Sequence, residues 1–393
     1  MTFKTISEAD VRGKRVLLRE DLNVPMKDGA IADETRITAA LPTLRWLHEH
    51  GAKTVILSHL GRPDGKPNPK YSLRPVAARL TELLGTPVTF VDDCVGDAAV
   101  AASKSLPDGG FVLFENVRFH AEEEANDPTF ARALAQSGDL YVNDAFGTAH
   151  RAHASTAGVA ADLPAYAGFL MQGELEALAR LIVNPAHPYV CAIGGAKVAD
   201  KVGVFTNLIA KVNAFVIGGG MANTFLAAQG IDVGKSLRDP DLEPAKKIIA
   251  LAKEKSVALH LPTDAVVADA FDADQTARTV PLSQVGEGMI LDIGPETGRA
   301  YAAVLREAKT IVFNGPMGVY EKAPYQQGTR AIGEAIAAAT KAGATSVVGG
   351  GDAAAAAHAL GFADAVTHVS TGGGATLEFL EGKTLPGVAA LER

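Results

Sequence analysis

Short apolar runs recur along the whole chain, and nearly every run ends in glycine, arginine, histidine or acidic residues. Most of the runs are apolar on both faces, which is typical of parallel β-strands covered by helices on both sides. In open sheets of such strands, ligands bind beyond the carboxyl ends. The pattern therefore predicts strands that lead into a binding site, over residues 15–21, 53–59, 87–91, 110–116, 140–144, 189–195, 214–220, 257–262, 310–316, 345–351 and 367–370.

Amphipathic stretches lie between the apolar runs, for example over 35–50, where apolar residues recur at helical spacing. Repeated strand–helix units predict an α/β fold of two doubly wound, Rossmann-like parallel-sheet lobes. A length of 393 residues suits two domains. We expect a first lobe over 1–170, a connecting helix over 171–185 that ends near Asn-Pro-Ala-His-Pro, and a second lobe over 186–376.

The composition excludes several classes of protein. The net charge is −8 and no basic stripe is visible, whereas non-specific nucleic-acid binders usually show one. The two cysteines, Cys94 and Cys191, lie in or beside apolar runs, so we expect buried free thiols and no zinc site. The N-terminus lacks a signal-peptide pattern, and no apolar run is long enough to span a membrane. These features predict a cytoplasmic protein that binds neither nucleic acid nor membranes.

The strand ends of the first half carry arginine, histidine, and acidic or amide side chains. They occur in REDLN (19–23), HLGRP (59–63), NVRFH (116–120) and NDAFGTAHRAH (143–153), and Arg36 lies at the start of the first helix. Guanidinium groups form paired, planar hydrogen bonds with phosphate and carboxylate. Several converging arginines therefore predict a small ligand with more than one negative charge.

The strand ends of the second half carry glycine and lysine instead. GGAKVADK (194–201) is expected to open a helix on which Lys197 and Lys201, four residues apart, share one face. Bare backbone lets a phosphate approach closely, and N–H groups at a helix start then face it. Asp352 is expected at the N-cap of its helix. The further glycine-rich strand ends are IGGGMAN (217–223), NGPMGVYE (314–321), GGGD (349–352) and STGGGAT (370–376).

Eight motifs together resemble the phosphoglycerate kinase family: REDLNVP, HLGRP, ENVRFH, VNDAFGTAHRAHAST, GGAKVADK, NGPMGVYE, GGGDAAAA and STGGGATLEFLEGKTLPGV. The resemblance runs from about Arg15 to Val388, in one order. It implies two α/β lobes with a substrate cleft between them, and a C-terminal segment, 377–393, that returns to the first lobe. It also implies a monomeric kinase of glycolysis and gluconeogenesis. Such an enzyme transfers a phosphoryl group reversibly between 1,3-bisphosphoglycerate and ADP, giving 3-phosphoglycerate and ATP, with Mg²⁺ as cofactor.

By the same resemblance, the first lobe binds 3-phosphoglycerate. Asp21 and Asn23 are expected to hold the glycerate hydroxyl and carboxyl end, and Arg36 to lie near the transferring phosphoryl group. The 3-phosphate would be held by His59, Arg62, Arg118 and Arg151, with Leu60 and Gly61 completing the substrate-binding set.

The second lobe is expected to bind the nucleotide. Lys197 would move with the transferred group, Lys201 would contact the nucleotide phosphates, and Glu321 would bond the ribose. Gly350 and Gly373 would offer catalytic N–H groups, and Asp352 would coordinate the metal. The full nucleotide-binding set is Lys197, Lys201, Gly219, Asn314, Pro316, Glu321, Gly350, Gly351, Asp352 and Ala353.

Three positions depart from the family pattern. Glu20 stands where an apolar residue is usual, Ala353 where threonine is usual, and Gly173 where charged residues are common. The backbone N–H of Ala353 remains, and N–H groups carry most of a phosphate contact at a helix start. We therefore expect nucleotide binding to survive the missing hydroxyl.

Two alternative functions follow from the same general pattern. A two-lobed binding protein of the periplasmic type would also close on a small anion, but it would need neither the lysine pair nor Asp352. A dinucleotide-dependent dehydrogenase would carry G-x-G-x-x-G, which is missing here. GIDVGKS (230–236) is not expected to be a P-loop, because only three residues separate its two glycines.

Overall fold

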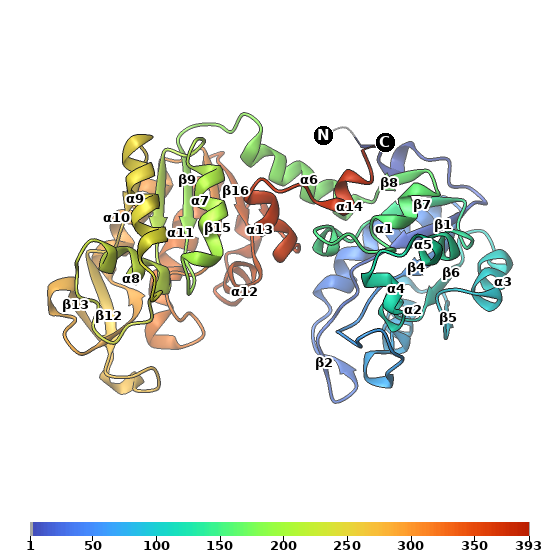
Figure 1. The fold of residues 1–393 in the computed structure, drawn as a ribbon, viewed down its shortest axis with the longest axis horizontal. Helices are drawn as coiled ribbons and strands as arrows, with labels where there is room; N and C mark the ends of the chain where they lie inside the picture. The colour runs from blue at the N-terminus through green and yellow to red at the C-terminus, as the bar shows by residue number, and fades with distance from the viewer. Residues whose placement is uncertain (1–2, 393) are drawn as a thin grey trace. The chain divides into compact units, whose positions relative to one another are not determined.

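The computed structural model describes residues 3–392 and divides the chain into two compact units. The N-terminal unit runs to Leu175 and is joined by the C-terminal segment from Thr384. The C-terminal unit is Glu176–Lys383. Helix α6 (Phe169–Ile182) begins in the first unit and ends in the second, so the chain passes from one to the other inside a helix (Figure 1).

The N-terminal unit is built on a six-stranded parallel sheet in the order β5-β6-β4-β1-β7-β8. Strand β1 therefore has β4 on one side and β7 on the other, and the chain reverses its direction of progress across the sheet there. Such a switch point is where open α/β sheets bind ligands. The strands are β1 (Arg15–Arg19), β4 (Lys53–Leu57), β5 (Val88–Val91), β6 (Phe111–Phe114), β7 (Leu140–Asn143) and β8 (Ala165–Ala167).

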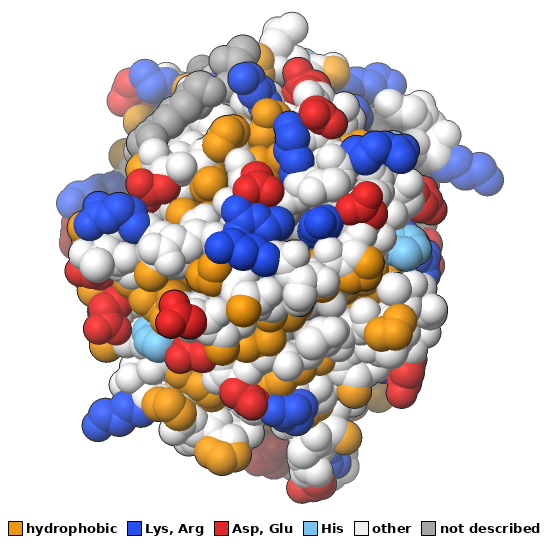
Figure 2. All heavy atoms as spheres, turned by 90° about the vertical axis from the view of Figure 1, so that its right-hand side faces the viewer, with side chains coloured by type: hydrophobic (Ala, Val, Ile, Leu, Met, Phe, Trp, Pro, Cys, Tyr) orange, Lys and Arg blue, Asp and Glu red, His pale blue; other side chains and the backbone are white. Residues whose placement is uncertain are grey.

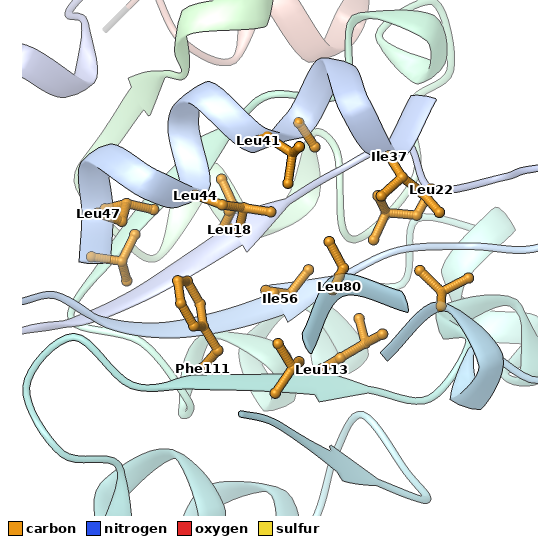
Figure 3. Close-up of a cluster of buried hydrophobic side chains, with 14 of the residues drawn as sticks. Leu18, Leu22, Ile37, Leu41, Leu44, Leu47, Ile56, Leu80, Phe111 and Leu113 are labelled. Atoms are coloured by element: carbon orange, nitrogen blue, oxygen red, sulfur yellow. The ribbon is translucent and has the colours of Figure 1, made fainter. Parts of the chain in front are cut away.

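Helices cover this sheet and bury one contiguous apolar cluster. Helix α1 brings Ile37, Leu41 and Leu44 from one face onto Leu18 and Ile56 of the central strands (Figure 3). A two-stranded hairpin, β2 (Met26–Lys27) and β3 (Ala30–Ile31), follows β1. The helices are α1 (Thr35–Glu49), α2 (Arg74–Leu84), α3 (Asp97–Ser105), α4 (Ala121–Glu124), α5 (Pro128–Ala135) and α14 (Pro386–Ala389).

The C-terminal unit repeats the architecture with the strand order β11-β10-β9-β15-β16-β17, again all parallel. Its switch point lies between β9 and β15. The strands are β9 (Tyr189–Ile193), β10 (Ala214–Ile217), β11 (Ala258–His260), β15 (Thr310–Asn314), β16 (Thr345–Val348) and β17 (His368–Val369). The helices are α7 (Val202–Leu208), α8 (Gly219–Ala228), α9 (Glu243–Glu254), α10 (Pro295–Arg306), α11 (Gln327–Lys341), α12 (Gly351–Ala359) and α13 (Gly374–Leu380).

The doubly wound parallel sheets predicted from the sequence are confirmed, and each predicted run contains a strand. The sequence prediction missed the short edge strand β8 and a separate three-stranded antiparallel sheet in the C-terminal unit. That sheet consists of β12 (Asp264–Ala268), β13 (Arg278–Pro281) and β14 (Met289–Ile293). Its strands are paired with one another and not with the parallel sheet, so the strand–helix alternation used for prediction does not extend to them.

Both cysteines are buried and free, as expected. Within residues 3–392, no helix has the length and apolar character needed to cross a membrane. On the face drawn in Figure 2, basic and acidic side chains are interspersed, with hydrophobic side chains scattered among them. GIDVGKS, over 230–236, is a loop with a single bridge from Gly234 to Met289, and no helix follows it directly.

Candidate active site

Asp21, Asn23 and Arg36 meet at the end of β1. The first hydrogen-bonded turn of α1 carries Arg36, whose Nη1 donates to the Asn23 carbonyl at 2.7 Å and to Asp21 Oδ1 at 3.3 Å. The amide oxygen of Asn23 accepts the N–H of Gly61 at 2.8 Å, which links the ends of β1 and β4. The structure therefore gathers four of the predicted substrate residues at the switch point of the sheet.

His59 lies beside this group, at the end of β4, and is buried. Its Nδ1 is 3.2 Å from Arg19 Nη2 and 4.0 Å from Asp21 Oδ1. Burial lowers the pKa of His59 well below its usual range, and the charges of Arg19 and Arg118, followed by other arginines, lower it further. The imidazole is therefore neutral, and it contributes a polar contact rather than another positive charge.

Arg118 carries a buried charge without a full set of hydrogen-bond partners, and the residue is only 3% exposed. Its Nη1 donates to the Gly61 carbonyl at 2.9 Å, and its Nε lies 3.1 Å from Glu124 Oε1. Its buried Nη2 has no hydrogen-bond partner among the described residues. Burial, with the neighbouring Arg151 charge, lowers the pKa of Arg118 to about 10. A buried donor without a partner costs about 1–3 kcal/mol, so this arrangement suits a bound anion.

The other predicted substrate residues differ in how they are placed. Arg151 Nε is 3.2 Å from His150 Nε2, and its charge acts on both Arg118 and His59. Arg62 is exposed and has no hydrogen bond or ion pair within residues 3–392. The side chain of Leu60 packs into the hydrophobic core, so only its backbone faces other groups; its carbonyl accepts Asn116 Nδ2 at 2.7 Å.

A buried network that the sequence did not reveal supports the arginines. Arg19, with 0% exposure, donates from Nε to Ser155 Oγ at 2.7 Å and from Nη1 to the Glu20 carbonyl. Ser155 donates in turn to Glu123 Oε1 at 2.6 Å. The position of Arg19 at a strand end predicts that it binds the ligand together with the other arginines. The structure shows instead a fully buried guanidinium that joins β1 to a segment 136 residues away.

In the C-terminal unit, Lys201 joins the two strands at the switch point. Its Nζ donates to the carbonyls of Gly194 and Asn314, each at 2.7 Å, just beyond β9 and at the end of β15. Burial lowers the pKa of Lys201 to about 8, against the opposing effects of the Cys191 thiol and the Asp352 and Asp200 carboxylates. Asn314 Nδ2 donates to the Gly349 carbonyl at 2.7 Å, and this extends the link to β16.

The glycines here allow very close backbone contacts. A Cβ on Gly194 would lie 2.0 Å from the Pro316 carbonyl oxygen. Gly219 has a φ of +65°, and its Cβ would lie 2.7 Å from the Gly195 carbonyl oxygen. Gly350, with a φ of +98°, is the N-cap of α12, and Gly373, with a φ of +51°, is the N-cap of α13. The N–H groups of Gly194 and Gly219 donate to the carbonyls of Asn314 and Met317, so the main-chain N–H groups left for a ligand are those at the starts of α12 and α13.

Two sequence predictions about this region are wrong. Lys197 and Lys201 do not share a helix face, because Lys197 precedes the short 3₁₀ turn Ala199–Lys201 and α7 begins only at Val202. Asp352 is not an N-cap, because Gly350 takes that position and Asp352 lies in the first turn of α12. The positive φ of Gly350 lets the chain enter the helix before the aspartate. Lys197 and Asp352 are both exposed.

A cavity of about 590 Å³ lies beside these strand ends. Four of the predicted nucleotide residues line it: Gly219, Pro316, Glu321 and Asp352. Most of its other lining is apolar and was missed by the sequence prediction, including Leu237, Phe271 and Met289. Leu237 and Phe271 are 56% and 46% exposed. Single exposed apolar residues have no signature in the sequence, so only the fold reveals this wall. Ala353, in contrast, is buried in the hydrophobic core, and Lys197, Lys201, Asn314, Gly350 and Gly351 lie outside the cavity lining.

A third group of polar side chains also escaped the sequence prediction. Asp93, Cys94 and His120 bring one potential metal-binding atom each within 4.8 Å of one another. Asp93 Oδ1 already accepts hydrogen bonds from the Cys94 N–H at 2.7 Å and from His120 Nε2 at 2.8 Å. The contacts therefore describe a hydrogen-bonded cluster at the end of β5.

Comparisons with known proteins agree with one another over almost the whole chain. A family model described as "Phosphoglycerate kinase" matches residues 6–383. The phosphoglycerate kinase of Pelotomaculum thermopropionicum is 55% identical over 393 residues, covering 100% of this chain and 99% of that protein. The cytosolic phosphoglycerate kinase of Triticum aestivum is 53% identical over 392 residues, covering 99% of this chain and 98% of that protein.

Solved structures give the same result. The structure of phosphoglycerate kinase from Coxiella burnetii has a TM-score of 0.91 at 45% identity and covers 99% of both chains. That from Pyrococcus horikoshii has a TM-score of 0.85 at 35% identity, covering 99% of this chain and 98% of that chain.

Proposed function

The chain belongs to the phosphoglycerate kinase family, and from this premise we propose how its residues divide the work of the reaction. The reaction is the reversible transfer of a phosphoryl group between 1,3-bisphosphoglycerate and ADP. We propose that the N-terminal unit binds the phosphoglycerate and that the C-terminal unit binds the nucleotide. The observation that carries the first assignment is Arg118, a buried guanidinium with an unpaired Nη2.

In the N-terminal unit, Arg118 and Arg151 hold the 3-phosphate, together with His59 and Arg62. Arg118 is held by the Gly61 carbonyl and Glu124, so a phosphate would meet donors that are already oriented. Asp21 and Asn23 hold the glycerate end. Arg36, fixed by its bonds to both of these residues, is left to neutralise charge on the transferring group.

The reaction needs no general base. In the ATP-consuming direction the attacking group is a carboxylate with a pKa near ~4, and it is already ionised at neutral pH. Phosphoryl transfer then depends on alignment and charge neutralisation. Arg36 and the exposed Lys197 supply positive charge, and the N–H groups around Gly350 and Gly373 supply hydrogen bonds. Because the phosphoryl group passes directly from donor to acceptor, turnover requires the two substrates to meet and water to be kept out.

In the C-terminal unit, the apolar cavity takes the nucleotide base, and Glu321 accepts a hydrogen bond from the ribose. Lys201 contacts the phosphates through the ammonium proton that its two carbonyl partners leave free. Asp352 would hold Mg²⁺. The residues fit that ion, because Mg²⁺ is usually bound by one or two carboxylates together with substrate phosphates and water, and Asp352 is an exposed carboxylate at the cavity wall. The ion would screen the negative charges of the phosphates.

Isothermal titration calorimetry on a pair of variants tests the division of substrates. We expect Arg118→Met to weaken 3-phosphoglycerate binding by about tenfold or more, since hydrogen bonds to charged groups contribute about 1.5–3 kcal/mol, and to leave Mg-ADP binding unchanged. Lys201→Met should do the reverse. The assignment is wrong if one variant loses affinity for both ligands, if Arg118→Met loses affinity for Mg-ADP alone, or if Lys201→Met loses affinity for 3-phosphoglycerate alone. The activity itself is measured separately, with 3-phosphoglycerate and Mg-ATP in a coupled assay.

The state of the protein in the cell belongs to the same proposal. We propose a monomer in the cytoplasm whose partners are its small-molecule substrates. Light scattering coupled to gel filtration should give a mass near the 40.7 kDa of one chain. A concentration-independent dimer would contradict the monomer.

A further inference from the structure

Two carboxylic acids that the reaction does not use lie side by side at the centre of the N-terminal unit. Glu20 follows β1 and Asp144 follows β7, and the preceding residues Arg19 and Asn143 are paired in the sheet. The Asp144 N–H donates to the Arg19 carbonyl at 2.9 Å. Glu20 is 1% exposed and Asp144 0% exposed. Two acidic side chains are therefore held next to each other, away from solvent.

The unpaired atoms of the two carboxyl groups indicate how they are held. Glu20 Oε1 and Asp144 Oδ2 are buried, and neither accepts a hydrogen bond from an ordinary N–H or O–H donor among the described residues. Each side chain acts on the pKa of the other, and a hydrogen bond between the two carboxyl groups would give both of these buried oxygens a partner. Two carboxyl groups can form such a bond only when one of them carries a proton. Burial raises the pKa of Asp144 to about 6 and, with the Asp144 charge, raises the pKa of Glu20 well above its usual range.

The neighbouring groups show which carboxyl holds the proton. Asp144 Oδ1 accepts the Met171 N–H at 3.0 Å, and the Thr43 hydroxyl and the Leu170 N–H also lower the pKa of Asp144 against the effect of burial. These donors stabilise a carboxylate. Glu20 has a negative charge on each side, because the charges of Asp144 and Asp21 both raise its pKa. The guanidinium of Arg19 is nearby, but its nitrogens are directed to Ser155, His59 and the Glu20 carbonyl. Glu20 is therefore the protonated partner.

Asp144 in turn fixes the start of helix α6. Met171 lies in its first turn, where N–H groups have no partner within the helix, and the Asp144 carboxylate accepts its N–H. A Cβ on Gly168 would lie 2.2 Å from Asp144 Oδ1, so the carboxylate packs directly on the backbone before the helix. Thr43 Oγ1 accepts the Phe169 N–H at 3.1 Å. The helix held in this way is the one in which the chain passes into the C-terminal unit.

We propose that Glu20 is a positioning residue for phosphoryl transfer, and that the proton it shares with Asp144 keeps the first turn of α6 and the neighbouring Asp21 in place. The part of this inference that involves Asp21 rests on the proposed function. When the proton is lost at alkaline pH, a second negative charge appears between Asp144 and Asp21. Repulsion then pushes Asp144 away from the first turn of α6 and disturbs the end of β1. Turnover slows, although the arginines that bind the substrate keep their positions and charges.

The variant Glu20→Gln tests the proposal, because its amide N–H can replace the shared proton but cannot ionise. We expect kcat of the wild type to fall at alkaline pH by about tenfold for each pH unit beyond the apparent pKa, and kcat of Glu20→Gln to stay flat. Glu49→Gln, an equal change of charge at an exposed position on α1, should follow the wild type. If Glu20→Gln keeps the wild-type pH profile, the proposal is wrong.

Two further measurements do not depend on activity. Burial also raises the pKa of Asp292 to about 8, so the Glu20 proton is measured as a difference: at neutral pH the infrared carbonyl band of protonated carboxylic acids should be larger in the wild type than in Glu20→Gln. The unfolded chain releases the Glu20 proton at a lower pH than the folded chain, so wild-type stability should fall as the pH rises toward the folded pKa. In Glu20→Gln, the part of this pH-dependent loss of stability that comes from Glu20 should be missing. If the glutamine variant does not fold, Glu20→Leu also removes the proton, and it should show the same loss of band intensity and of pH dependence. A band of wild-type intensity in either variant overturns the shared proton, whatever the roles of the substrate residues.

Discussion

The two units place their candidate ligand groups at the same point of the same fold, yet they use different parts of the chain. At the switch point of the N-terminal sheet, the groups are side chains: Arg36, Arg118 and Arg151, supported by the buried Arg19–Ser155–Glu123 network. In the C-terminal sheet, they are mainly main-chain N–H groups at the glycine-rich starts of α12 and α13, beside a switch point that Lys201 cross-links. We therefore propose that one fold supports two ways of binding a phosphate.

The difference has a thermodynamic consequence. A buried guanidinium without a full set of partners lowers stability until an anion arrives, so the N-terminal site is held at some cost to the free energy of unfolding. The glycine loops of the C-terminal site carry no such unpaired charge. At Gly194 and Gly219 their requirement is steric, because a Cβ there would overlap a neighbouring carbonyl. Substitutions at the two sites should therefore change stability in opposite directions.

The largest expected effect is on catalysis, in Arg36→Ala and Lys197→Ala. Each removes a positive charge that we assign to the transition state, and the loss of one such group typically lowers kcat by about 100-fold to 1000-fold. We expect KM for either substrate to change far less. Steady-state kinetics with both substrates varied measures the split. Arg45→Ala, an exposed arginine on the same helix as Arg36, is the control. A change confined to KM would show that Arg36 only binds substrate.

The opposite effects on stability are tested by Gly219→Ala and Arg118→Met. Gly219→Ala forces a left-handed φ on alanine, which costs about 1–2 kcal/mol, and adds a clash with the Gly195 carbonyl. Without ligands, we expect it to lower the free energy of unfolding. Arg118→Met removes a buried unpaired donor and should raise it by about 1 kcal/mol. Urea unfolding measures both. Gly173→Ala adds the same methyl group at an open, exposed glycine inside α6, where alanine should raise stability by about 1 kcal/mol, so it shows that the loss at Gly219 comes from the site. If both variants change the free energy of unfolding in the same direction, the proposed difference between the two sites is wrong.

Lys201 is expected to make nucleotide binding depend on pH. As the pH rises through about 8, the pKa to which burial lowers Lys201, the ammonium loses its proton and its attraction for phosphate. Mg-ADP affinity should therefore fall between pH 7 and pH 9. Stability should move the other way, because the unfolded chain binds the extra proton between about 8 and the ordinary pKa of 10.5. Calorimetry and urea unfolding at several pH values measure the two trends. In Lys201→Arg, which stays charged, affinity should not fall; a fall of the wild-type size would point to another group.

Much of the fold followed from the sequence because parallel strands buried on both faces are local signals. The apolar runs that end in Arg19, Leu57 and Asn143 mark strands whatever lies around them. The strand ends identified His59 and Arg118 as candidate site residues for the same reason. The structure brings these two residues close to Asp21 and Arg36, as the shared edge of a parallel sheet requires.

The rest depends on contacts between distant segments. Nothing near Arg19 in the sequence shows that Ser155, 136 residues later, binds it and removes it from the ligand-binding set. The prediction that Lys197 and Lys201 share a helix face is wrong because their spacing is helical only in the sequence, and the segment is a loop followed by a 3₁₀ turn. The apolar wall of Leu237 and Phe271 comes from loops, where single exposed apolar residues carry no periodicity. Glu20 and Asp144 gave no sign that they pair, since their strands become neighbours only in the sheet.

The smallest effect on binding is expected at Ala353. It tests whether the main-chain N–H groups at the start of α12 bind phosphate without help from a side-chain hydroxyl at this position. The side chain is 1% exposed and packs in the core with residues such as Ile336 and Val348. Ala353→Thr should therefore lower stability by about 1–3 kcal/mol through overpacking. It should change Mg-ADP affinity by less than about tenfold, or ~1.4 kcal/mol. Calorimetry of this variant beside Ala355→Thr, an exposed position on the same helix, separates the two effects. If threonine at 353 tightens Mg-ADP binding more than tenfold, a hydroxyl reaches the nucleotide from a position that the fold turns inward, and backbone N–H groups are then not sufficient to explain phosphate binding at this strand end.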